Sequence, residues 1–299
     1  MAIISTMRQR TAVLLVFAAL AVSSCAGAQR VDYASEFATE GVKLATTLPG
    51  FYDQYFKLAI NADSATLLTR REQPSVTPER LQQDLSNADA DLKRTGALVG
   101  GLKEHATLLG NYFAEIRKLT DGNVGEGTGT ATADLVERIE KVRGDFGRDP
   151  FGIPVDQVAK PVGDFVVVAL KNQALKRELQ DHGETIDREL AVQEVILSKL
   201  GQSMIGNSEA WMTGALINPV YEQFRDKSKS VGTGWYKKRE TYLTDTSAIK
   251  SAQQAEQAMN ELRIAWRELA GGGPQGSTVE RLIGHVEATI AMINALNAD

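Results

Sequence analysis

Residues 81–116 have the sequence LQQDLSNADADLKRTGALVGGLKEHATLLGNYFAEI, and this stretch decides the fold class. Small or apolar side chains recur along it in alternating steps of four and three. The positions in this stripe are Leu81, Leu85, Ala88, Leu92, Thr95, Val99, Leu102, Ala106, Leu109, Phe113 and Ile116. Heptad spacing places such side chains on one face of a helix, which is stable only when that face is covered. The stretch predicts a helix of roughly 60 Å that packs against a neighbour.

The residues before this stripe predict where the helix begins and what precedes it. Thr77 is a suitable N-cap, Pro78 suits the first helical position, and Glu79 suits the positive end of the helix dipole. Heptad spacing also runs from Phe37 to Ala65 and predicts an earlier helix that ends near residues 70–72. Pro49 lies inside that run, where it either kinks one long helix or starts a second one.

The rest of the chain alternates between helical patterns and Gly/Pro-rich stops. Residues 121–130 (DGNVGEGTGT) predict a flexible loop, and residues 144–154 (GDFGRDPFGIP) predict a connection between two parts of the chain. The further predicted helices cover residues 134–143, 155–205 (bent at Pro161), 208–224 (broken by Pro219), 246–269 and 278–296.

The predicted fold is all-α, with long antiparallel helices in one or two up-and-down bundles. The helical body divides into a first part, residues 32–143, and a second part, residues 155–299, on either side of the connection at 144–154. The chain of 299 residues is 43% hydrophobic and 24% charged, as expected of a folded body with a core. Its formal net charge of −5 argues against nucleic-acid binding, which requires a basic face.

Residues 1–24 have the three parts of an export signal. Arg8 and Arg10 form a positive start, residues 11–20 (TAVLLVFAAL) form an apolar middle, and small residues follow. The apolar run is shorter than the roughly 20 residues of a membrane-spanning helix. The single cysteine of the chain, Cys25, comes directly after this signal, so the chain cannot form an internal disulfide.

Val22-Ser23-Ser24-Cys25 resembles the lipobox of bacterial lipoproteins: an aliphatic residue, two small residues and a cysteine. The resemblance implies a diacylglyceryl thioether on Cys25, cleavage before it and N-acylation of the new terminus. Residues 25–31 would then form a short lipidated tether. Since Ala26 follows the cysteine, the resemblance implies an outer-membrane location that faces the periplasm. The alternative is an ordinary secretory leader in which Cys25 has no role.

The sequence shows no pattern that amounts to a catalytic, cofactor or metal site. His105, His182 and His285 are scattered. Glu178 and His182 are four residues apart and could share a metal, but a satisfied core histidine or a simple ion pair is favoured. Three short matches to known motifs are interpreted as linkers, because the residues around them lack the other features that each motif requires. These are Asp145-Phe146-Gly147, Gly125-x-Gly127-x-Gly129 and Asp121-Gly122-Asn123.

One stretch of this acidic chain is both basic and aromatic. It contains Arg225, Lys227, Lys229, Trp235, Tyr236, Lys237, Lys238 and Arg239. Such a stretch could bind an anionic partner, such as phospholipid head groups, lipopolysaccharide phosphates or an acidic protein. The alternative is a solvated helix end with Trp235 in the core.

These observations favour a non-catalytic interaction or scaffolding module, anchored in the bacterial envelope by its lipid and bound to another envelope protein. A second hypothesis is a binding protein for an apolar or amphipathic small molecule held between helices, which would require an enclosed apolar pocket. An enzyme of unidentified type is a third.

Overall fold

The computed structural model describes residues 3–120, 128–145, 165–167, 172–226, 228, 232–244, 247–271 and 276–297. The predicted all-α class is confirmed, because every regular element among these residues is a helix. The elements are α1 (Ile3–Arg71), α2 (Pro78–Thr120), α3 (Thr128–Asp145), α5 (Gln173–Trp211), the π-helical segment η2 (Met212–Ile217), α6 (Asn218–Arg225), α7 (Thr233–Thr244), α8 (Ser247–Gly271) and α9 (Gly276–Asn297).

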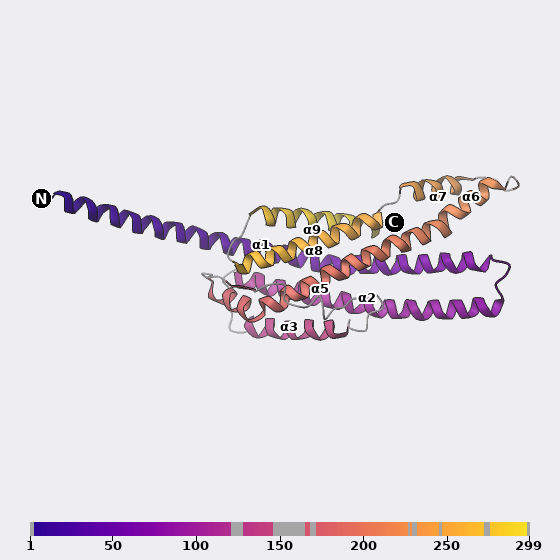
Figure 1. Ribbon diagram of the computed structural model, residues 1–299, viewed down its shortest axis with the longest axis horizontal. Coiled ribbons are helices and arrows are strands. Elements are labelled where there is room, and N and C mark those ends of the chain that lie inside the picture. Colours follow the sequence, from indigo (N-terminus) through magenta and orange to yellow (C-terminus); the bar gives the residue numbers. More distant parts are fainter. Residues whose placement is uncertain are drawn as a thin grey trace.

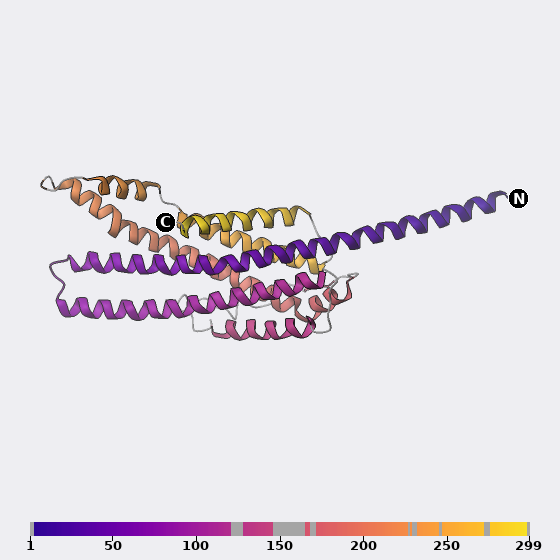
Figure 2. The ribbon, with the colours of Figure 1, turned by 180° about the vertical axis from the view of Figure 1, so that it is seen from behind.

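The helices form an elongated bundle, and its two ends differ (Figure 1). α1 and α2 run antiparallel along its length, and α5 crosses them. α8 packs on α1 and α5, and α9 packs on α1 and α8. The N-terminal portion of α1 projects alone from one end, whereas α6 and α7 lie at the opposite end (Figure 2). No helix in the described part of the chain is long and apolar enough to cross a membrane.

α1 is one continuous helix, so Pro49 does not start a second one. Proline removes a single backbone hydrogen bond, and packing on both sides of it holds the helix together. Leu48 and Phe51, which flank this position, are fully buried. The backbone of residues 25–31, the predicted tether, is also part of this helix.

α2 begins where its sequence predicts. The Thr77 hydroxyl accepts a hydrogen bond from the backbone N–H of Arg80 at 3.3 Å, as an N-cap does. Hydrogen bonds from the backbone N–H of Glu79 and from the Thr77 side chain lower the pKa of the Glu79 carboxyl. A carboxylate is therefore favoured at the positive end of the helix dipole.

The predicted stripe of α2 is buried along its second half and partly exposed along its first half. Leu102, Leu109 and Phe113 are at most 1% exposed, whereas Leu85 is 51% exposed. The difference arises because the second half lies among α1, α3 and α5, while the first half lies beside α1 near the end of the bundle (Figure 1). The spacing therefore predicted the inward face correctly but could not tell how many neighbours cover it.

The predicted helix over residues 155–205 is wrong at both ends. Residues 165–167 are not helical, and α5 begins only at Gln173. The Asn172 side chain caps α5, since its oxygen accepts from the N–H groups of Ala174 and Leu175 at 3.1 Å. Residues 155–164, with the predicted bend at Pro161, and residues 168–171 lie outside the described residues.

The C-terminal end of α5 also differs from the prediction, because the helix continues through Gly206 and η2 into α6. Pro219 does not break it; the wider π turn directly precedes this proline, which has no N–H to donate. Within that turn the N–H of Asn218 donates to the Thr213 carbonyl. A Cβ on Gly214 would lie 2.8 Å from the Cβ of Ala65, so glycine is needed where η2 touches α1.

The two Gly-rich stretches are only partly described. Residues 128–130 of the predicted loop at 121–130 belong to α3, as do Gly144 and Asp145 of the predicted connection at 144–154. Residues 121–127 and 146–154 lie outside the described residues. The predicted helices over 246–269 and 278–296 are confirmed as α8 and α9, with bounds that differ by one or two residues.

One hydrophobic core joins the two predicted parts of the body, and Trp266 lies at its centre. The Trp266 ring stacks on Phe37 with centroids 5.5 Å apart and meets Phe113 edge-on at 6.5 Å. Its indole N–H donates to the carbonyl of Gly183 at 2.9 Å. A Cβ on Gly183 would collide with the ring of Phe165, which also packs on Trp266. This core ties α1, α2, α5 and α8 together.

Candidate functional site

The basic and aromatic stretch forms a short helical hairpin at the end of the bundle opposite the N-terminus (Figure 1). α6 leads into the turn and α7 leads back from it. We name the hairpin surface by its described residues: Tyr221, Phe224, Arg225, Trp235, Tyr236, Lys237, Lys238 and Arg239. The remaining predicted members of the patch, Lys227 and Lys229, lie outside the described residues.

Trp235 holds the two helices of this hairpin together. Its ring stacks on Phe224 with centroids 5.9 Å apart and meets Tyr236 edge-on at 5.3 Å. Its N–H donates to the Val220 carbonyl at 2.9 Å, and the Arg239 guanidinium lies 5.9 Å from the ring centroid, within cation–π range. Trp235 is half-buried and lies outside the bundle core, so the alternative that placed it in that core is wrong.

The other aromatic side chains of the hairpin surface are open to solvent. Phe224 is 71% exposed, and Tyr221 and Tyr236 are each 64% exposed. Contiguous exposed apolar area on a folded protein typically marks an interaction site. Our sequence interpretation missed Tyr221 and Phe224, although their spacing of three already places them on one side of a helix.

The charge of this region is opposite to that of the chain. Residues 218–244 contain six basic and three acidic side chains, in a chain whose formal net charge is −5. Among the described residues, Arg225, Lys237 and Arg239 are exposed and Lys238 is half-buried. The hairpin therefore carries both exposed aromatic rings and exposed cations.

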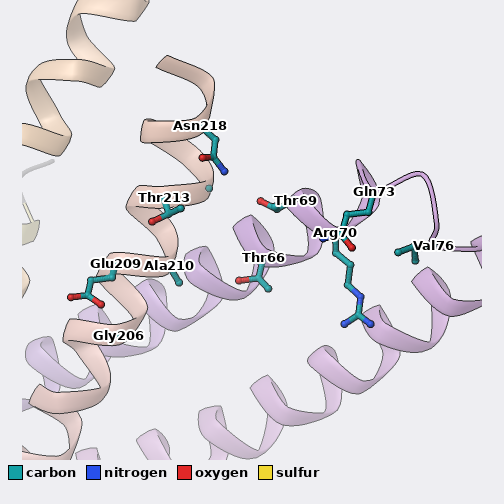
Figure 3. Close-up of a pocket in the computed structure, with 11 residues that line it drawn as sticks. Thr66, Thr69, Arg70, Gln73, Val76, Gly206, Glu209, Ala210, Thr213 and Asn218 are labelled. Atoms are coloured by element: carbon teal, nitrogen blue, oxygen red, sulfur yellow. The ribbon is translucent and has the colours of Figure 1, made fainter. Parts of the chain in front are cut away.

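A groove of about 640 Å³ lies between the end of α1 and the segment that links α5 to α6 (Figure 3). Its polar lining includes Thr66, Thr69, Gln73 and Asn218, with Asn218 pointing toward the end of α1. Arg70 also lines it and pairs with Asp84 at 2.9 Å. The groove is open to solvent, unlike the enclosed pocket that the small-molecule hypothesis requires.

A chain of buried polar groups crosses the bundle core. The Tyr52 hydroxyl donates to the Gln193 amide oxygen at 2.5 Å, and the Gln193 amide nitrogen lies 2.6 Å from His105 Nδ1. His105 Nε2 lies 3.1 Å from Glu189 Oε2, and Arg143 Nε lies 3.2 Å from Glu189 Oε1. These polar groups link α1, α2, α3 and α5 and help to align the four helices.

His105 is therefore a buried histidine with a partner at each ring nitrogen. Its side chain and that of Glu189 are fully buried, so this arrangement offers no access to a substrate. The Glu178 carboxylate has the hydroxyls of Tyr112 and Thr132 as its partners and not His182: it accepts from Tyr112 at 3.0 Å and from Thr132 at 2.7 Å.

The other residues that bear on metal or nucleotide chemistry are not brought together. His285 Nδ1 lies 3.3 Å from the Gln254 side-chain oxygen, and His182 lies on another helix. Within the described ranges, no three His, Cys, Asp or Glu side chains are grouped to hold a metal ion. Of the three motif matches, only Gly129 and Asp145 fall in the described residues, as parts of α3.

The buried tyrosines give a testable pH dependence. Burial raises the pKa of Tyr52, and burial together with the Glu178 carboxylate raises the pKa of Tyr112. In the unfolded chain these phenols ionise near pH 10, whereas in the folded chain they stay protonated. Proton loss above pH 10 then favours the unfolded state, so the free energy of unfolding should fall as the pH rises from about 9 to 11.

Urea unfolding of wild type and Tyr52→Phe across this pH range measures the effect. The free energy of unfolding should fall less steeply with pH in Tyr52→Phe than in wild type. In Tyr236→Phe, which alters an exposed ring, it should fall as steeply as in wild type. Equal slopes in wild type and Tyr52→Phe would contradict the assignment.

Comparison of the chain with family models, with curated proteins and with solved structures gives no match. The functional argument therefore depends on the residues themselves.

Proposed function

We propose that the chain is a lipid-anchored, non-catalytic interaction module of the bacterial envelope, which uses the hairpin surface to hold an anionic partner. The lipobox resemblance at Cys25 supports the anchor and the outer-membrane location. The helical bundle is the rigid spacer between anchor and partner. In this role the protein helps organise an envelope assembly.

The observation that carries this proposal is the hairpin surface itself. Three exposed aromatic rings and three exposed cations belong to the same short hairpin, on a chain that is acidic elsewhere. The bundle core does not need these rings, because its own aromatic contacts are made by Phe37, Phe113 and Trp266. Rings that stay mostly exposed and lie outside the bundle core are best explained by a partner that covers them.

Photo-crosslinking in the cells that make the protein tests the proposal. Tyr236 is replaced by p-benzoylphenylalanine, which keeps an aromatic ring at a position that is 64% exposed. The matched control carries the same residue at Glu104, which is exposed on α2 and away from the hairpin. After irradiation, intact-mass analysis should show an adduct at position 236 and none at position 104.

An adduct with a protein or with a lipid would support the proposed docking role. Equal labelling at positions 236 and 104, or no adduct at 236, would contradict it.

A further inference from the structure

We infer that the anionic partner of the hairpin surface is a phospholipid bilayer, and that this bilayer faces the one that holds the lipidated Cys25. The inference rests on the proposed function, since it names the partner of the same surface. It follows from the composition of the hairpin, from its charge and from its position on the bundle.

The composition fits the boundary between lipid head groups and acyl chains. Tyr and Trp rings are amphipathic and bury their apolar bodies while the hydroxyl or N–H stays near water, and Lys and Arg reach head groups with their charged ends. Tyr221, Tyr236 and Phe224 are exposed on the same two helices that carry the exposed Arg225 and Lys237. Leu243, which is 59% exposed on the same helix as Tyr236, adds apolar area.

The charge pattern favours an anionic bilayer over an acidic protein. Lysine is depleted at the centres of protein interfaces, whereas clustered Lys and Arg are typical of surfaces that meet anionic lipids. Residues 218–244 carry six basic side chains, four of them lysines. Two short helices at the corner of the bundle also form a projecting shape, which suits a broad surface better than a protein groove (Figure 1).

The position of the hairpin separates it from the anchor. η2, which leads into the hairpin, touches α1 at Ala65. Ala65 follows Cys25 by 40 residues of one continuous helix, so the two points are about 60 Å apart at a rise of about 1.5 Å per residue. A molecule anchored at Cys25 and standing on its bilayer would therefore present the hairpin to an opposing surface.

A two-vesicle capture experiment tests the inference with the mature protein extracted from expressing cells. The protein is reconstituted into zwitterionic phosphatidylcholine donor vesicles, and its flotation with them is measured first. Fluorescent acceptor vesicles with or without 30% phosphatidylglycerol are then added, and acceptor capture by the donors is measured. Capture should require phosphatidylglycerol and should be lost in 1 M NaCl, where charge screening acts within a few ångströms.

Two pairs of variants decide which surface is responsible. Arg225→Glu with Lys237→Glu reverses two exposed charges of the hairpin, and capture should fall by at least about tenfold. Phe224→Ser with Tyr236→Ser should also reduce capture strongly. Lys57→Glu with Lys93→Glu makes the same change of charge at exposed positions of α1 and α2 and should leave capture unchanged.

The outcomes separate the inference from the proposed function. If the protein does not float with donor vesicles, the anchor fails, and direct flotation of the protein with phosphatidylglycerol vesicles then tests the hairpin alone. If it floats but captures no acceptors, or captures them equally after the hairpin changes, the inference is overturned while the anchor stands. A crosslink from position 236 to a protein, with no lipid adduct, would also overturn it.

Discussion

Trp266→Ala is expected to lower the free energy of unfolding by about 3–5 kcal/mol, the usual cost of emptying a large aromatic site in a core. The Trp266 ring is fully buried and touches rings from three other segments, namely Phe37, Phe113 and Phe165. Its loss also leaves the Gly183 carbonyl without its indole donor. A loss of this size is a large share of a typical stability of about 5–15 kcal/mol.

Urea unfolding followed by circular dichroism measures this effect, and Trp235→Ala is the matched control. Trp235 lies in the hairpin and outside the bundle core, so its removal should change global unfolding by less than about 1 kcal/mol. If the two variants unfold alike, Trp266 is not the centre of the core.

Cys25→Ser is expected to abolish anchoring completely. The lipobox resemblance implies that the thioether forms on the Cys25 sulfur before cleavage, and a serine hydroxyl does not replace this thiolate. The variant should therefore accumulate as an unprocessed chain that still carries residues 1–24. Because the resemblance places both the diacylglyceryl group and the amide-linked acyl chain on Cys25, the variant would carry no acyl chain at all.

Immunoblotting of fractionated cells shows the size and location of the product. Ser23→Ala keeps a small residue before the cysteine and should be processed as wild type. If Cys25→Ser is cleaved and exported normally, the leader is an ordinary secretory signal and the anchor does not exist.

Regular spacing made most of the fold predictable from the sequence. α2 has an uninterrupted stripe with the N-cap Thr77, and both its start and its buried face were predicted correctly. α8 and α9 were also predicted within two residues, because the glycine-rich residues 271–276 separate them in the sequence.

Residues that usually end helices caused the errors. Pro49 and Gly206 both lie inside continuous helices. Proline costs the helix one backbone hydrogen bond and glycine has a low helix propensity, but tertiary packing of the whole helix outweighs both costs. The start of α5 was placed too early because the cap at Asn172 depends on a distant contact: its amide donates to the Leu119 carbonyl at 2.7 Å. Such a contact has no signature in the local sequence.

The candidate site was predicted only in part. The basic residues of the hairpin were visible as a cluster in the sequence, but the contact of Phe224 with Trp235 joins two different helices. The buried chain from Tyr52 through Gln193 and His105 to Glu189 joins three helices, at separations of 84 to 141 residues. Only the packed bundle reveals these pairs.

The central claim is that one end of this molecule is fixed to a membrane by lipid while the other end is free to bind. Intact-mass analysis of the native mature protein tests the anchor most directly. The account predicts a chain that begins at Cys25 and carries the mass of a diacylglyceryl group and an amide-linked acyl chain. A mature chain without acyl mass, or one that begins at another residue, would contradict it.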